Sequence, residues 1–278
     1  PRGRGVAAPG PPGGEPGGGA RGPGGAMGAE AARRRAKASG ARARDAALGF
    51  YLVAYNLAQA AGWGLAFVLL VQGWRAGGPR GAWAAAGPLC YVMQCVAGLE
   101  VLHAALGLVK ARWSSAALQW VARTNLVALV VAETREIWGE PAVAAMLGAW
   151  ALGELVRYPW YALTVLGACP RALTWLRYTA FVPLYPVGFL GEMVCIVRAL
   201  PHLEARPRFQ EGPLSELVPE GLRRVAGLSP LSYHAFMMCM LVYYPVGWFG
   251  LYSHMFRQRR RKLGADAGAE GGEKKKQR

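Results

Sequence analysis

Long uninterrupted runs of apolar residues, separated by short polar connections, dominate the middle of this chain. They lie at residues 47–72, 84–109, 115–132, 141–168, 172–200 and 231–256. Each is close to or above the roughly 20 residues that a helix needs to cross about 30 Å of hydrocarbon. The runs are continuous rather than alternating, which favours helices over the strands of a barrel. We therefore expect an all-α fold, an integral membrane bundle of six transmembrane helices.

Both ends of the chain differ from this apolar body. Residues 1–30 hold 12 Gly and 6 Pro and almost no large apolar side chain, a composition typical of disorder. The sequence thus predicts a disordered Gly/Pro/Arg-rich tail at 1–46, a six-helix membrane domain at 47–256 and a short basic tail at 257–278. The first methionine is Met27, so whether residues 1–26 are translated stays open.

Basic charge is concentrated in these two tails. The net charge is +16, and each tail carries nine Lys and Arg against three acidic residues. Six crossings bring both ends to the same side of the membrane, and the positive-inside rule places basic flanks in the cytosol. We therefore expect both termini to be cytosolic. A nucleic-acid-binding domain would carry its basic residues on the folded body, so no nucleic-acid partner is expected.

Ionisable side chains inside the predicted helices are costly and mark candidate functional sites. The candidates are Glu100, His103, Arg123, Glu154, Arg157 and Glu192. Glu154 and Arg157 are three residues apart and share a helix face, and the same spacing gives Glu100 a partner in His103. Glu192 has no basic neighbour at its depth in its own helix. It either acts as a general acid or base, or pairs with Arg123 across helices and only holds the bundle together.

The fifth apolar run contains the segment Leu184–Glu192, which reads LYPVGFLGE. Seven residues make almost two turns of α-helix, so Tyr185 and Glu192 face the same way, about 10.5 Å apart along the axis. Gly188 lies between them on that face. One reading is a notch in which a phenol and a carboxyl reach a thin chain such as an acyl group. The other is a kinked helix in which Gly188 serves close helix packing.

The pattern YPxGxxxE at Tyr185–Glu192, followed by ALPH at 199–202, resembles the very-long-chain (3R)-3-hydroxyacyl-CoA dehydratases. This group is also called the protein tyrosine phosphatase-like A family. Other blocks agree with it in order over residues 48–262: Tyr51 to Asn56 with Gly62 and Trp63, Leu99 to His103 with Gly107, Gln119 with Arg123, and Glu154 to Tyr158 with Tyr161. The resemblance implies six crossings of the endoplasmic reticulum membrane and cytosolic termini.

The resemblance also implies a reaction, the third step of very-long-chain fatty acid elongation. In it a (3R)-3-hydroxyacyl-CoA loses water to give a trans-2-enoyl-CoA, with no metal and no redox cofactor. Tyr185 and Glu192 are then the catalytic pair. Further residues are expected to bind substrate or support the site: Gly188, Arg157, Tyr158, Tyr161, Glu154, Arg123 and Glu100. The implied partners are the long-chain acyl-CoA, the lipid bilayer and other fatty acid elongation enzymes.

Other functions fit these residues less well. The four histidines form no HxxH or HxxxH pair and the five cysteines no CxxC pair, so neither a metal site nor a disulfide framework is expected. No cysteine is followed six residues later by Arg, as a cysteine phosphatase needs. The remaining alternative is a non-enzymatic membrane scaffold or a small transporter. Against it, no internal repeat is visible, and only the fifth run is strongly broken.

Overall fold

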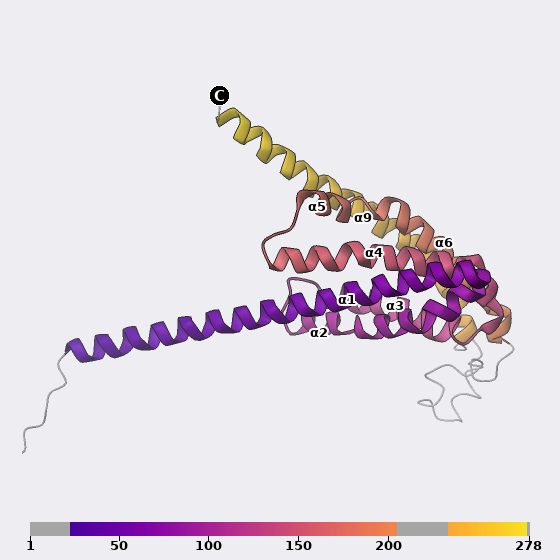
Figure 1. Ribbon diagram of the computed structural model, residues 1–278, viewed down its shortest axis with the longest axis horizontal. Helices are drawn as coiled ribbons and strands as arrows, with labels where there is room; N and C mark the ends of the chain where they lie inside the picture. Colours follow the sequence, from indigo (N-terminus) through magenta and orange to yellow (C-terminus); the bar gives the residue numbers. More distant parts are fainter. Residues whose placement is uncertain (1–22, 205–232, 277–278) are drawn as a thin grey trace, which may run out of the picture. The chain divides into compact units, whose positions relative to one another are not determined.

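The computed structural model describes residues 23–204 and 233–276, coloured in chain order in Figure 1. All regular structure in these residues is helical, which confirms the all-α prediction. The helices are α1 (Pro23–Val96), α2 (Leu99–Ala105), α3 (Trp113–Asn125), the π-helix η1 (Leu126–Val131), the 3₁₀-helix η2 (Arg135–Gly139), α4 (Pro141–Val165), α5 (Arg171–Arg177), α6 (Phe181–Glu204) and α9 (Tyr233–Lys276). The chain divides into two compact units, Pro1–Ala47 and Leu48–Arg278, and the site described below lies within the second.

A break in α1 at Gly77 and Gly78 separates two helical arms. Gly78 has a φ of +60°, which residues with a Cβ rarely adopt, and Gly77 also lies outside the helical region. The arms approach closely beside this break. A Cβ on Gly73 would lie 2.2 Å from the backbone oxygen of Gly81, and a Cβ on Gly81 would lie equally close to that of Gly73. Gly77 and Gly78 therefore form the turn between the first two predicted membrane segments, and Gly73 and Gly81 allow the two arms to pack closely beside it.

The prediction of a disordered tail at 1–46 was wrong for residues 23–46, which belong to α1. Glycine and proline are concentrated before Met27, whereas the residues that follow it are rich in Ala and Arg. Both are among the best helix formers, and this outweighs the composition of the tail as a whole. Residues 1–22, for which disorder was also predicted, lie outside the described residues.

Three stretches of described helix are long and apolar enough to cross a membrane: Lys37–Ala105, Arg171–Leu203 and Tyr233–Gly264. The first of them contains the first predicted segment, 47–72, and the second, 84–109, as far as Ala105. The third predicted segment is split between α3 and the π-helix η1, and the fourth, α4, carries Glu154 and Arg157, so neither combines the same length and apolarity. The basic tail predicted after residue 256 continues α9 as far as Lys276.

The packing around α6 positions the candidate site. α6 contacts α4, α9 and η1, while α2 contacts α3. The buried core draws on several of these helices, with Trp63 of α1, Val130 of η1, Leu147 and Tyr158 of α4, and Cys195 of α6. α4 and α6 approach closely at Gly191. A Cβ there would lie 2.9 Å from the Cβ of Met146 and 3.0 Å from the backbone oxygen of Ala142.

Candidate active site

Glu192 on α6 has a buried carboxyl that is hydrogen-bonded from two other helices. The indole N–H of Trp150 on α4 donates to Oε1 at 2.7 Å. The hydroxyl of Tyr244 on α9 donates to Oε2. Within the described part of the chain Glu192 forms no ion pair, and Arg123 pairs with Glu154 instead. The reading in which Glu192 pairs with Arg123 is therefore wrong.

Tyr185 lies two turns before Glu192 on α6 and is half-buried. Its ring stacks on Trp248 and on Tyr252 of α9, with ring centroids 5.8 and 5.7 Å apart. Trp248 and Tyr252 also stack on each other at 4.8 Å. These ring contacts define where the phenol of Tyr185 lies, and no described residue hydrogen-bonds to its hydroxyl.

Both residues of the predicted pair face the same stripe of α9. Tyr244, Trp248 and Tyr252 follow one another at intervals of four residues and so share one helix face. Glu192 contacts the first of them, and Tyr185 contacts the other two. This placement agrees with the seven-residue spacing of Tyr185 and Glu192, which predicts that they face the same way.

Gly188 does not line an open notch between these two residues. A Cβ on Gly188 would lie 3.6 Å from the Cβ of Ala149 and 3.9 Å from Cδ1 of Trp150, both on α4. The space over this glycine is therefore filled by α4. Of the two readings, these contacts favour packing of α6 on α4 over a groove for an acyl chain, although they leave room for the methyl group of an alanine.

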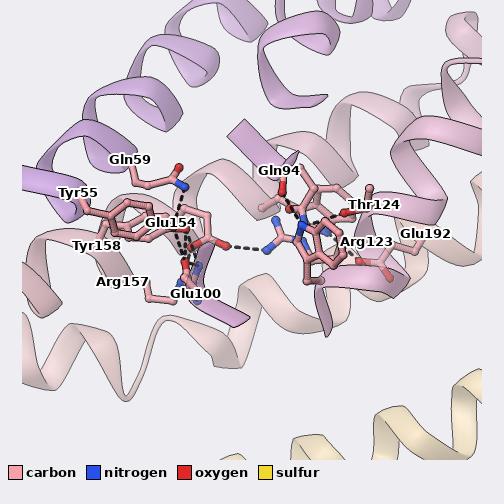
Figure 2. A network of polar contacts seen from close by, with 12 residues as sticks. Tyr55, Gln59, Gln94, Glu100, Arg123, Thr124, Glu154, Arg157, Tyr158 and Glu192 are labelled. Atoms are coloured by element: carbon pink, nitrogen blue, oxygen red, sulfur yellow. Dashed lines mark hydrogen bonds and ion pairs between the residues drawn. The ribbon is translucent and has the colours of Figure 1, made fainter. Parts of the chain in front are cut away.

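A second group of polar side chains joins α2, α3 and α4 in one chain of ion pairs (Figure 2). Arg157 donates to both oxygens of Glu100, at 2.8 and 2.9 Å, and to Glu154 at 2.5 Å. Arg123 donates to the other oxygen of Glu154 at 2.6 Å. The pair Glu154–Arg157 predicted from the spacing is confirmed. Two guanidiniums thus serve two carboxyls, and Glu192 is the carboxyl left over.

Tyrosines surround the Glu100 end of this group. The hydroxyl of Tyr158 donates to Glu100 at 2.5 Å, and that of Tyr55 on α1 lies 3.5 Å from the same oxygen. Tyr161 lies farther out, with the guanidinium carbon of Arg157 5.9 Å from its ring centroid. The candidate residues Glu100, Glu154, Arg157, Tyr158 and Arg123 therefore lie together, whereas Tyr161 is at the margin.

The expected pairing of Glu100 with His103 was wrong. Glu100 binds Arg157, which lies 57 residues away in the sequence. The ring nitrogen Nε2 of His103 is hydrogen-bonded to the hydroxyl of Tyr51 at 2.8 Å instead. Shared position on a helix face brings two residues near each other, but a guanidinium from another helix offers the carboxylate two charged donors in one plane.

Arg123 lies between the two groups. Its guanidinium carbon is 4.2 Å from the ring centroid of Trp150, whose indole N–H donates to Glu192. One nitrogen, Nη1, binds Glu154. The other two, Nε and Nη2, are buried and have no hydrogen-bond partner among the described residues. Buried donors are nearly always paired in folded proteins, so this edge of the guanidinium lacks the partner that such donors usually have.

Comparison with known proteins identifies the family of this chain. The family described as "Protein tyrosine phosphatase-like protein, PTPLA" matches residues 94–265, which include both groups of side chains from Glu100 to Tyr244. The "Very-long-chain (3R)-3-hydroxyacyl-CoA dehydratase 2" of Mus musculus is 33% identical over 215 residues, 77% of this chain and 80% of the mouse protein. The chain belongs to the PTPLA family.

Other relatives bear dehydratase names as well. The "Very-long-chain (3R)-3-hydroxyacyl-CoA dehydratase 1" of Mus musculus is 30% identical over 248 residues, 88% of this chain and 85% of the mouse protein. The "Very-long-chain (3R)-3-hydroxyacyl-CoA dehydratase" of Gallus gallus is 29% identical over 217 residues, 77% of this chain and 57% of that protein. No solved structure matches the chain. The family resemblance found in the sequence is thus confirmed.

Aromatic residues around the catalytic candidates of this PTPLA-family chain were missed by sequence reasoning: Trp150, Tyr244, Trp248 and Tyr252. Three of them carry a signal, the four-residue interval between polar aromatics on one face of α9. Such a stripe in an apolar helix indicates an inward face rather than a lipid-facing one. Trp150 carries no comparable signal, because its partner is set by the packing of α4 on α6.

Proposed function

We propose that this chain catalyses the dehydration of (3R)-3-hydroxyacyl-CoA to trans-2-enoyl-CoA, a step of very-long-chain fatty acid elongation. The observation that carries the proposal is family membership, with relatives named for this activity at 33% and 30% identity over 77% and 88% of the chain. The arrangement of Tyr185 and Glu192 supports it. Both face α9 from one side of α6, and the reaction needs two groups that exchange protons with one substrate.

The two proton transfers fall to Tyr185 and Glu192 in this proposal. The C2–H bond of the substrate breaks, and its electron pair forms the double bond between C2 and C3. The C3–O bond breaks at the same time or afterwards, and the hydroxyl leaves as water after taking up a proton. One group of the pair accepts the C2 proton, and the other supplies the proton to the leaving hydroxyl.

Arg123 is proposed to bind the thioester carbonyl of the substrate. Negative charge develops on this oxygen as the C2–H bond breaks. The free nitrogens Nε and Nη2 are buried beside Trp150, where a donor to such an oxygen acts with little competition from water. Glu154 binds Nη1 and keeps the guanidinium oriented.

The remaining candidates are proposed as supports of this arrangement. Arg157 holds Glu154 and Glu100 together, and Tyr158 donates to Glu100, so the group joins α4 to α2 and fixes the carboxyl that binds Arg123 of α3. Tyr161 extends the group at its margin. Gly188 lies where α6 packs on α4, beside Trp150, whose indole N–H donates to Glu192.

The setting proposed for this activity is the endoplasmic reticulum membrane. We propose six crossings with both termini in the cytosol, supported by the basic residues of the two tails. The long acyl chain of the substrate reaches the site within the membrane, while its CoA part stays with the cytosolic face. Other enzymes of fatty acid elongation are the proposed partners, since they supply the 3-hydroxyacyl-CoA and consume the enoyl-CoA.

Product analysis of the purified chain tests this function. Full-length protein in detergent is incubated with (3R)-3-hydroxyacyl-CoAs of several chain lengths, and the enoyl-CoA formed is measured by mass spectrometry. Wild type is expected to form it, and Tyr185→Phe and Glu192→Ala are expected to form it at least about 100-fold more slowly. If wild type forms no enoyl-CoA from any of them, the proposed reaction is wrong. If the variants match wild type, the reaction stands and the assigned pair is wrong.

A further inference from the structure

Tyr244 on α9 is one of two neutral donors that hold the Glu192 carboxyl. Its hydroxyl donates to Oε2, while the indole N–H of Trp150 on α4 donates to Oε1 at 2.7 Å. The donors come from different helices, so the carboxyl connects α4 and α9 through α6. Each carboxyl oxygen has its own donor, and a rotation of the carboxyl plane would break both hydrogen bonds.

The ring of Tyr244 is itself held in place by packing. Phe189, three residues before Glu192 on α6, stacks on it with ring centroids 5.8 Å apart. Phe189 also stacks on Trp248 at 4.7 Å, and Trp248 stacks on Tyr185 at 5.8 Å. The hydroxyl that reaches Glu192 therefore belongs to a ring fixed within the same aromatic stack as the phenol of Tyr185.

A carboxyl that exchanges a proton with a substrate must keep one orientation, since proton transfer needs heavy-atom distances of about 2.6–3.2 Å. Glu192 has no ion pair within the described residues to hold it. The donors on Tyr244 and Trp150 supply this constraint. Trp150 also lies against Arg123, whereas Tyr244 binds nothing polar but Glu192 in the described contacts, so its effect is easier to isolate.

We propose that Tyr244 is a positioning residue for the dehydration: it holds the Glu192 carboxyl in the orientation in which that group exchanges a proton with the hydroxyacyl substrate. This inference rests on the proposed function. It gives α9 a direct part in the site, although both members of the catalytic pair lie on α6.

The test compares Tyr244→Phe with Tyr243→Phe in full-length protein purified in detergent, with (3R)-3-hydroxyhexadecanoyl-CoA as the substrate. Tyr243 is the adjacent residue on α9 and is 64% exposed, so its hydroxyl is the matched control. For Tyr244→Phe we expect kcat to fall about tenfold, which corresponds to the free energy of one hydrogen bond, with KM within about twofold of wild type. For Tyr243→Phe we expect no change in either constant.

A double-mutant cycle separates positioning from a general structural effect. If Tyr244 acts through Glu192, Tyr244→Phe added to Glu192→Gln lowers kcat no further than Glu192→Gln alone. Losses that multiply in the double variant would overturn the proposal. So would a Tyr244→Phe variant with the kcat of wild type.

A second variant keeps the proposal testable if Tyr244→Phe folds poorly. Replacement of Tyr244 by para-aminophenylalanine retains the ring and places an N–H donor where the hydroxyl was. We expect kcat within about threefold of wild type, because the donor to Oε2 is kept. A folded para-aminophenylalanine variant whose kcat is as low as that of Tyr244→Phe, or about tenfold below wild type, would overturn the proposal.

Failure of this inference and failure of the proposed function give different results. If wild type forms no enoyl-CoA, the reaction itself is wrong, and positioning for it has no meaning. If wild type is active, Glu192→Gln is strongly slowed and Tyr244→Phe matches wild type, the reaction and the role of Glu192 stand and the role of Tyr244 alone is wrong.

Discussion

Tyr252 on α9 donates its hydroxyl to the backbone carbonyl of Val182 on α6, at 3.0 Å. Val182 lies four residues before Pro186, which has no N–H to offer that carbonyl. The hydrogen bond from Tyr252 therefore replaces the missing helical one. It also ties α9 to the turn of α6 that carries Tyr185, on whose ring Tyr252 stacks.

Tyr252→Phe is predicted to weaken this connection. The carbonyl of Val182 loses its donor in an apolar surrounding, which costs about 0.5–2 kcal/mol of stability. The unfolding midpoint in detergent should fall by a few degrees, and kcat should fall less than for Tyr185→Phe, because the ring contact remains. An unfolding midpoint equal to that of wild type would contradict this account of Tyr252.

Tyr185→Phe and Glu192→Gln are predicted to lower kcat by about 10²–10⁴, the usual share of general acid–base catalysis, while both variants stay folded. The reason is that each removes a proton-transfer group and keeps the shape of the side chain. Steady-state kinetics on the purified variants checks this, with Tyr91→Phe as the control at an exposed tyrosine. Variants with kcat within about threefold of wild type would remove these residues from the mechanism.

Arg123→Lys is predicted to separate the two roles of Arg123. A lysine keeps a positive charge for Glu154, so the unfolding midpoint should change little, but it lacks the planar pair Nε and Nη2 that is proposed to bind the thioester oxygen. We expect kcat/KM to fall by about 10- to 100-fold. A kcat/KM equal to that of wild type, at unchanged stability, would mean that the free edge does not bind substrate.

Arg157→Met is predicted to be strongly destabilising. It leaves Glu100 without its cation and Glu154 with Arg123 alone, and removing one partner of a buried ion pair costs about 3–5 kcal/mol. Arg198→Met is the matched control. Its pair with Glu140 is longer, at 3.4 Å, and its side chain is 62% exposed, so its loss should cost less than about 1 kcal/mol.

Thermal and denaturant unfolding in detergent compare these two arginine variants. Equal unfolding midpoints for Arg157→Met and Arg198→Met would show that the chain of ion pairs around Glu154 does not stabilise the fold.

Gly188→Ala and Gly191→Ala are predicted to differ although both lie on α6. A Cβ at position 191 would lie 2.9 Å from the Cβ of Met146 and 3.0 Å from the backbone oxygen of Ala142, so the helices must separate and stability should fall by about 1–3 kcal/mol. A Cβ at position 188 meets Ala149 at an ordinary 3.6 Å, so this variant should keep its stability and activity.

Activity assays on Gly188→Ala distinguish packing from substrate binding. Loss of activity in a stably folded Gly188→Ala protein would restore the reading in which an acyl chain passes over this glycine.

Short stretches of sequence were enough to predict several features of this chain. Continuous apolar runs predicted an all-helical membrane protein, and the motif around Tyr185 and Glu192 predicted its family. The spacing of three residues predicted the ion pair between Glu154 and Arg157, because both lie one turn apart on one helix. Composition averaged over the first 46 residues misled, since helix formation depends on the Ala- and Arg-rich part alone.

Contacts between helices could not be predicted from short stretches of sequence, because they join residues that lie far apart in the chain. Glu100 binds Arg157 rather than His103, which is only three residues away in the sequence. Glu192 binds Tyr244, which is 52 residues away. The spacing of Tyr185, Gly188 and Glu192 left a notch and a packing contact equally open, and the structure has α4 packed over Gly188. The sequence by itself determined which residues share a helix face, since this depends on 3.6 residues per turn. Only the tertiary structure decided which faces meet, because the distance and rotation of packed helices depend on side chains from several helices at once.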